Sequence, residues 1–194
     1  VFMNAVLYFS DGQGNFDIVG LNQKDYMDQW GGGKEKVDKT HAHASTIGDY
    51  NNDGIDDLVI FWSDIATEEN EWGARNWNNI LLGPIDKTNP TYLDSDEWGR
   101  LPEPFYGPDN ANYNDAESGD INGDGFDDIV VGSTRKNPYY AGRHVQILIS
   151  NGDGTFNDET DTRFVDQPRA GLDQSLTGTG IGEGVIFLKD MDLD

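Results

Sequence analysis

The amino-acid sequence predicts an all-β protein built from repeated four-stranded antiparallel units. The first observation is an internal repeat, because Gly48–Val59 aligns without a gap on Gly119–Val130 with eight identities. The second is its period of about 70 residues, since Asp49 recurs as Asp120 and the pattern begins again at Asp190. The third is that each unit contains short β-type runs and no ten-residue amphipathic helix pattern. Periods of this length are typical of stacked or radially arranged units.

Four short strands are expected in each unit. His41–Ile47 precedes the first repeated segment, and Leu58–Trp62 follows it with the β-branched and aromatic residues that favour strands. A third strand is expected at Asn79–Leu82 and, one unit later, at Val145–Ile149, followed by a turn and a short last strand. Four-stranded sheets that repeat at this length indicate the blades of a β-propeller.

A second repeated marker supports this organisation. Ser10–Phe16 matches Ser150–Phe156, which lies two periods further along the chain. Both segments contain an Asp-Gly or Asn-Gly pair, which hairpin turns of two residues prefer. In the middle unit the longer Pro84–Pro90 stretch replaces this turn.

The repeated segments are acidic loops with the spacing of a metal site. Each reads Asp-x-Asn-x-Asp-Gly-x-x-Asp, so oxygen-bearing side chains stand at loop positions 1, 3, 5 and 9 and a glycine at position 6. Calcium takes six to eight oxygen ligands at about 2.3–2.6 Å, and a tight loop of this kind supplies most of them. The apolar residue at position 7, Ile55 or Phe126, would contribute its backbone carbonyl. We therefore predict Ca2+ as the cofactor.

An EF-hand is the alternative interpretation of these loops. It requires a bidentate acid at position 12 and helices on both sides. Position 12 is Ile60 in the first loop and Val131 in the second, and both loops lead into runs typical of strands. The EF-hand interpretation is therefore rejected.

The composition excludes several classes of partner. A formal net charge of −23 and a pI near 4.1 argue against nucleic acid and anionic membrane surfaces, because binding to either depends on basic side chains. The chain has no cysteine, which excludes a disulfide framework and thiolate metal sites. No apolar run approaches the roughly 18 residues of a membrane-spanning helix, so no direct membrane insertion is expected.

Calcium loops of this kind suit the millimolar calcium outside cells. No Asn-x-Ser/Thr glycosylation site is present, since Asn89-Pro90-Thr91 is blocked by its proline. We therefore expect an extracellular, secreted or cell-surface protein, of bacterial origin.

The acidic segments, with the Asn-Gly-Asp-Gly-Thr-Phe run that begins at Asn151, closely resemble the FG-GAP/VCBS repeats of bacterial surface proteins and of the integrin α-chain propeller. The resemblance covers nearly the whole chain. It implies a propeller of roughly seven blades that holds calcium between the first two strands of a blade. The implied metal ligands are Asp49, Asn51, Asp53, the Ile55 carbonyl and Asp57 in the first loop, Asp120, Asn122, Asp124, the Phe126 carbonyl and Asp128 in the second, and Asp190, Asp192 and Asp194 in a truncated third.

Roughly seven blades of about 70 residues would need roughly 490 residues, so we expect this chain to be a fragment with about two full blades plus partial ones. Its open sheet edges would be covered by the remaining blades of the parent protein or by neighbouring subunits. The predicted organisation is the end of a blade in residues 1–20, a blade in residues 41–110 with calcium loop 49–57, a blade in residues 113–180 with calcium loop 120–128, and the start of a further blade in residues 182–194.

Blade topology predicts two different rims. The metal loops and Asn-Gly turns share one rim, and the long connections Ser63–Trp77 and Ser133–Arg143 lie on the other. Aromatic and arginine side chains on that long-loop rim favour a glycan or protein ligand, although packing between blades is the alternative for any one of them. The candidate ligand-binding residues are Trp72, Arg75, Trp77, Arg135, Tyr139, Tyr140 and Arg143, with Phe105 and Tyr106 among the other aromatic residues expected on this rim.

The leading functional hypothesis is an adhesion or ligand-binding module with structural calcium. A catalytic or non-catalytic propeller part of a polysaccharide-degrading enzyme, such as a lyase, is the alternative, and a structural subunit of a surface filament is the third. The sequence has no Gly-x-Ser-x-Gly, His-Glu-x-x-His or cysteine nucleophile. Carboxylate pairs are uninformative in a chain with 36 acidic residues. The sequence therefore favours a non-enzyme without deciding the question.

Overall fold

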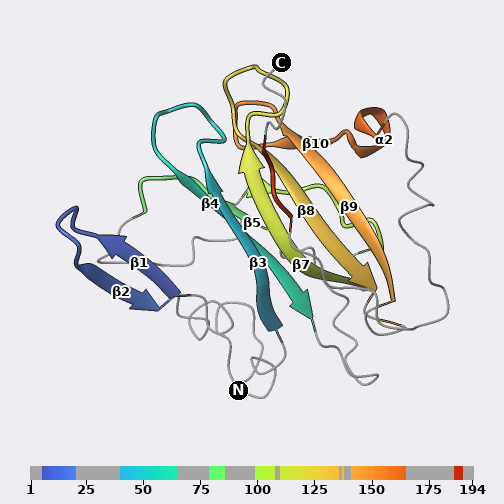
Figure 1. Ribbon diagram of the computed structural model, residues 1–194, viewed down its shortest axis with the longest axis horizontal. Helices are drawn as coiled ribbons and strands as arrows, with labels where there is room; N and C mark the ends of the chain where they lie inside the picture. Colours follow the sequence, from blue (N-terminus) through green and yellow to red (C-terminus); the bar gives the residue numbers. More distant parts are fainter. Residues whose placement is uncertain are drawn as a thin grey trace.

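The computed structural model describes residues 6–20, 40–64, 79–85, 99–107, 110–135, 137, 141–164 and 186–189. These residues form three antiparallel sheets and one helical turn (Figure 1). No helix in this described part is long and apolar enough to cross a membrane. The expected all-β class with four-stranded antiparallel sheets is therefore confirmed.

A two-stranded sheet comes first in the chain, and two four-stranded sheets follow, in the orders β3-β4-β5-β6 and β10-β9-β8-β7. The elements are β1 (Val6–Ser10), β2 (Phe16–Gly20), β3 (Thr40–Gly48), β4 (Asp57–Asp64), β5 (Asn79–Leu81), β6 (Gly99–Arg100), β7 (Ala111–Gly119), β8 (Asp128–Arg135), β9 (Ala141–Ser150), β10 (Phe156–Asp158) and α2 (Thr160–Arg163).

The two larger sheets repeat each other in register as well as in sequence. The pair Gly48–Asp57 closes the β3–β4 hairpin, and the pair Gly119–Asp128 closes the β7–β8 hairpin. Both first strands carry a bulge, between Ala42 and Ala44 in β3 and at the same repeat position in β7. The internal repeat is therefore a repeat of three-dimensional structure.

The first strands of successive units lie side by side at one period of the sequence. The Ser118 hydroxyl of β7 donates to the Ile47 carbonyl of β3 at 2.8 Å, over 71 residues. The backbone N–H of Ile186 donates to an Asp115 carboxylate oxygen of β7 at 2.7 Å, again over 71 residues. Residues 186–189 thus stand beside β7 as β7 stands beside β3.

The core lies between the two four-stranded sheets. Val59 and Phe61 from β4 and Ile129 and Val131 from β8 belong to one apolar cluster, and all four are almost fully buried. The Phe61 ring lies 4.9 Å from the Tyr113 ring, centroid to centroid. Both β4 and β8 are inner strands with neighbours on each side, which explains their continuous apolar runs.

The connection between β8 and β9 is shorter than the sequence predicted. β8 continues to Arg135 and β9 begins at Ala141, so the connection consists of residues 136–140 rather than the whole of Ser133–Arg143. Pairing of Ser133 with His144 and of Arg135 with Ala141 extends the ladder across these polar residues. Arg135 and Arg143 therefore lie on strands.

Candidate metal centres

The β3–β4 hairpin loop folds its acidic side chains back over its own backbone. The two oxygens of the Asp49 carboxylate accept hydrogen bonds from the N–H groups of Asp53 (3.0 Å) and Gly54 (2.9 Å). The Asn51 amide oxygen also accepts from the Asp53 N–H, at 3.0 Å. The side chains of loop positions 1 and 3 therefore converge on the N–H of position 5.

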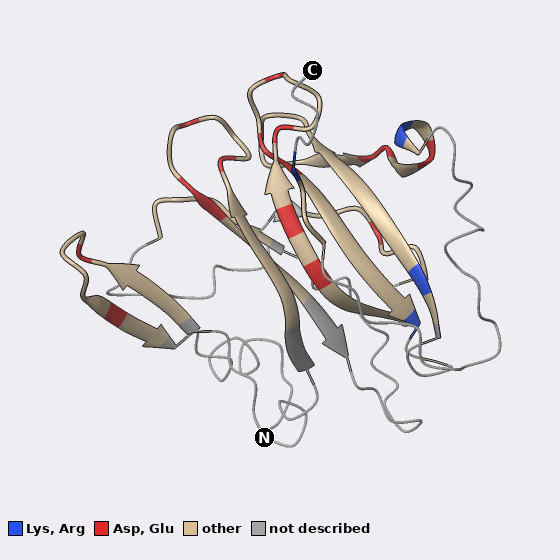
Figure 2. Ribbon diagram, viewed as in Figure 1, with Lys and Arg blue, Asp and Glu red and all other residues tan. Residues whose placement is uncertain are grey.

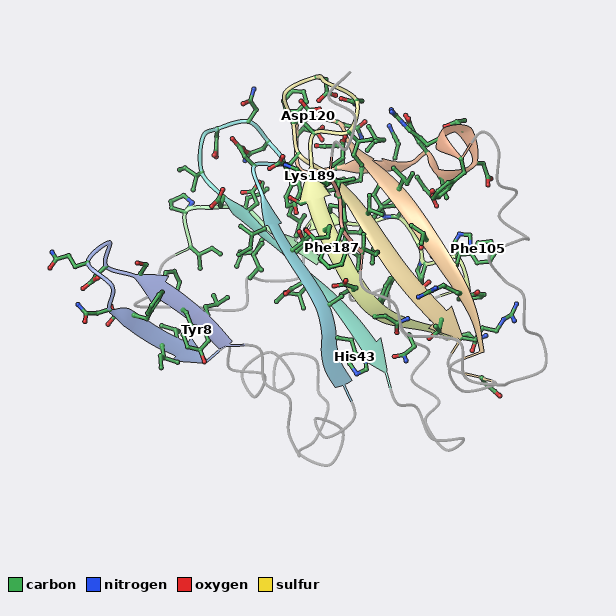
Figure 3. All side chains as sticks on the ribbon, viewed as in Figure 1. Tyr8, His43, Phe105, Asp120, Phe187 and Lys189 are labelled. Atoms are coloured by element: carbon green, nitrogen blue, oxygen red, sulfur yellow. The ribbon has the colours of Figure 1, made fainter. Side chains whose placement is uncertain are left out.

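The β7–β8 loop repeats this pattern. The Asp120 carboxylate accepts from the N–H groups of Asp124 (3.1 Å) and Gly125 (3.0 Å), and the Asn122 amide oxygen accepts from Asp124 at 2.9 Å. Acidic residues stand in both hairpin turns, which lie at the same end of the molecule (Figure 2), and Asp120 is labelled there in Figure 3. Two loops that stand one sequence period apart thus have one geometry.

Loop position 9 is buried, which the sequence alone did not indicate. Asp57 is fully buried, and its carboxylate accepts hydrogen bonds from the N–H groups of Tyr50 (3.0 Å) and Gly83 (2.7 Å). Burial raises the pKa of Asp57, and the nearby carboxylates of Asp53 and Asp49 raise it further, while the two backbone hydrogen bonds lower it. Asp57 therefore joins the loop, its own hairpin and the segment that follows the third strand of the sheet.

Asp128 occupies the same place in the second loop. It is fully buried, and its carboxylate accepts from the N–H groups of Ile121 and Ser150, both at 2.9 Å. Burial again raises the pKa, with a further contribution from the carboxylates of Asp124 and Asp120. Each loop thus concentrates negative charge around a buried acid.

The residue at loop position 7 has a packing role that the sequence did not reveal. A Cβ atom added to Gly83 would lie 2.6 Å from Ile55 Cγ2, and one added to Gly152 would lie 2.5 Å from Phe126 Cζ. Ile55 and Phe126 therefore rest directly on the glycine that follows the third strand. The sequence signal nearest to this contact is the Asn151-Gly152 pair, which by itself predicts only a turn.

The donor set of each loop fits a hard cation. It consists of the carboxylates of Asp49, Asp53 and Asp57 and the amide oxygen of Asn51, and the second loop offers the same groups. Carboxylate and carbonyl oxygens are the ligands that Ca2+ prefers. In the part of the chain that the structure describes, no three His, Cys, Asp or Glu side chains are already arranged to hold a metal ion. The loop oxygens are engaged instead by backbone N–H groups, as described above.

Two aromatic residues predicted on the long-loop rim pack against a sheet. Phe105, labelled in Figure 3, stacks on the ring of the fully buried His144 with centroids 3.6 Å apart, and Tyr106 meets the same ring edge-on at 6.1 Å. The Arg135 guanidinium lies 4.8 Å from the centre of the Tyr106 ring. Both rings therefore pack on β9, although Phe105 remains 41% exposed, and a ligand-binding role of the rim stays a prediction.

Several predicted site residues lie outside the described residues. They are the third-loop acids Asp190, Asp192 and Asp194, and the rim residues Trp72, Arg75, Trp77, Tyr139 and Tyr140.

The repeated four-stranded antiparallel sheets, each with an acidic hairpin between its first two strands, define a protein of β-propeller blades. Comparison with known families agrees, because residues 113–143 match the FG-GAP repeat. The matched segment includes β7 from Tyr113 onwards, the loop at Asp120–Asp128, β8 and the beginning of β9. No curated protein and no solved structure gave a match.

Proposed function

We propose that each acidic hairpin binds one Ca2+ ion, and that the ions stabilise a β-propeller module of an extracellular protein. The observation that carries this proposal is the shared geometry of the two loops, including the buried acid at position 9. The ligands would be the side chains at positions 1, 3, 5 and 9 and the carbonyls of Ile55 and Phe126.

The bound ion would supply positive charge to three crowded carboxylates. Their mutual repulsion opposes closure of the hairpin, and burial of Asp57 or Asp128 adds a desolvation cost. The chain provides the rest of the structure: Asp49 and Asn51 order the turn, and Asp57 holds it to Gly83, which follows the third strand. Calcium is thus assigned a structural role.

Calorimetric calcium titration of the full chain tests the proposal. We expect binding at both loops, and loss of one site each in Asp53→Ala and Asp124→Ala. Asp11→Ala is the matched control, because Asp11 also caps a hairpin turn through the N–H groups of Gln13 and Asn15 but lies outside the nine-residue pattern. Equal calcium binding in all four proteins, or none in the wild type, would contradict the assignment.

We further propose that the rim opposite the metal loops binds a glycan or protein ligand. Arg135 at the end of β8 and Arg143 near the start of β9 are its described candidates, and both are half-buried. Arg143→Ala should weaken saturable binding to an array of glycans and surface proteins, whereas Asp11→Ala should not. Release of unsaturated sugars by the protein would instead favour the lyase alternative.

A further blade is the proposed partner of the β1–β2 sheet. Tyr8 and Phe16 on this sheet are 65% and 59% exposed, whereas their repeat counterparts Leu148 and Phe156 are buried between the two larger sheets. A sheet of the same kind would therefore cover this face, from the same parent protein or a neighbouring subunit. Sedimentation should show less self-association after Tyr8→Ser, and unchanged association would contradict the proposal.

A further inference from the structure

The two acidic loops are joined by a reciprocal pair of hydrogen bonds. The N–H of Asp127 donates to the carbonyl of Asp49 at 3.2 Å, and the N–H of Asp49 donates to the Asp127 carboxylate at 3.0 Å. Asp49 is the first residue of its loop, and Asp127 directly precedes the buried Asp128 of the other. The contact therefore joins the start of one candidate site to the end of the next.

A second connection runs between the buried acids. The N–H of Tyr50 donates to Asp57, and the Ser150 hydroxyl donates to the carbonyl of Tyr50 at 2.8 Å. The N–H of Ser150 in turn donates to Asp128. The backbone of one residue, Tyr50, and one serine thus connect position 9 of the first loop with position 9 of the second.

The residues around these hydrogen bonds are closely packed. A Cβ atom on Gly48 would lie 2.6 Å from the Ser118 hydroxyl and 2.9 Å from Asp127 Cβ. Tyr50 is fully buried, and its ring meets the Phe156 ring edge-on at 5.4 Å. A shift of one loop must therefore move the groups that hold the other.

We infer that the two calcium sites are energetically coupled, with Asp127 and Ser150 as the positioning residues that transmit the coupling. This inference rests on the proposed calcium binding. An ion in the first loop would fix Asp49 and Asp57, and with them the backbone groups that hold Asp127 and Ser150. The neighbouring loop would then bind its ion with less ordering left to complete, so the coupling is positive.

The variants must distinguish an effect of the Asp127 charge from an effect of its hydrogen bond with the Asp49 N–H. Asp127→Asn removes the charge but keeps an oxygen that accepts from the Asp49 N–H, whereas Asp127→Ala removes both. Ser150→Ala removes the bond to the Tyr50 carbonyl without changing charge. Asp56→Ala is the matched control, because Asp56 stands at the same position of the first loop, is exposed, and makes no inter-sheet hydrogen bond among the described residues.

The test is calcium affinity measured site by site in the full chain. Asp53→Ala and Asp124→Ala give the affinity of each remaining site alone, and the wild type gives the two sites together. We expect the second ion to bind the wild type about 5-fold or more tightly than it binds a single-site variant. Asp127→Ala and Ser150→Ala should reduce this ratio towards one, while Asp127→Asn and Asp56→Ala should preserve it.

Two results would overturn the inference while leaving the proposed function intact. One is independent binding of both ions by the wild type. The other is an equal loss of coupling in Asp127→Asn and Asp127→Ala, which would assign the effect to charge. Absence of calcium binding at both loops would overturn the inference and the proposed function together, so the two failures are distinguishable.

Discussion

Backbone conformation determines which residues the acidic loops accept. Gly54 and Gly125 at loop position 6 have φ angles of 81° and 92°, in the left-handed region that L side chains rarely adopt. Position 4 is also left-handed, with φ of 55° at Asn52 and 78° at Gly123. Asparagine is one of the few other residues found there, which explains the difference between the repeats.

Gly125→Ala should therefore destabilise the protein through the backbone alone. No atom lies within 4 Å of a Cβ built on Gly125, so crowding adds nothing. We expect a loss of about 1–2 kcal/mol in the free energy of unfolding, measured by urea denaturation. Asn52→Gly is the control and should stay within about 0.5 kcal/mol. An unchanged Gly125→Ala protein would show that the turn differs from the one described.

Tyr50 links stability to alkaline pH. Burial is the main effect that raises the pKa of its phenol to about 12, although neighbouring hydroxyls favour the ionised form. The folded-state pKa lies above the unfolded value of 10.0. Burial of the neutral phenol therefore makes its full contribution to folding stability below pH 10, and this contribution is lost as pH rises towards 12. Two pKa units correspond to about 3 kcal/mol.

Tyr50→Phe should remove that pH dependence. The wild-type free energy of unfolding should fall by about 3 kcal/mol more than that of Tyr50→Phe between pH 10 and pH 12. The other tyrosines are common to both proteins, so the difference isolates Tyr50. Parallel pH profiles would contradict the burial of this phenol.

At the scale of elements, the hairpins stabilise one another across the sheets. The β3–β4 loop contacts the β7–β8 hairpin through Gly48, and the β7–β8 hairpin contacts residues 186–189 through Gly119. These two glycines occupy the same repeat position but face different neighbours. Gly48 meets the short Ser118 and Asp127 side chains, whereas Gly119 meets the flexible end of Leu188.

Gly48→Ala should accordingly destabilise the protein more than Gly119→Ala does. The new methyl group would lie 2.9 Å from Asp127 Cβ, so the hairpins must separate, at a cost of about 1–3 kcal/mol. In Gly119→Ala the methyl would lie 3.0 Å from Leu188 Cδ2, which can rotate away. Chemical denaturation of the two variants gives the comparison. Equal destabilisation would argue against close contact between the loops.

The sequence predicted the elements well because their causes are local. The repeat period, the glycines of the turns and the β-branched runs can all be read from the chain itself, so the strands appear close to where they were expected. The burial of Asp57 and Asp128 was missed because it depends on Gly83, just after β5, and on Ser150, at the end of β9, both distant from the loops in sequence. A local sequence motif identifies an acidic loop, but it does not identify the distant residues that bury the acid at position 9.

The contacts of Phe105 and Tyr106 could not be predicted for the same reason, and ligand binding at the long-loop rim stays a prediction. Phe105 and Tyr106 pack on His144, about 40 residues further along the chain, which periodicity does not reveal. Likewise, Arg135 and Arg143 continue strands because their partners extend the ladder. The chemistry of these side chains predicted ligand recognition, whereas contacts between residues distant in sequence determine where the side chains lie.

At the scale of the whole molecule, the sheets, the core between them and the loops at one rim form a repeating assembly in which calcium is proposed to hold each hairpin closed. Thermal unfolding of the full chain, followed by circular dichroism in millimolar calcium and again in excess chelator, tests this most directly. With calcium at about 100 times its dissociation constant, two sites should raise the melting temperature by about 10 °C or more. Coincident melting curves in calcium and in chelator would contradict the account.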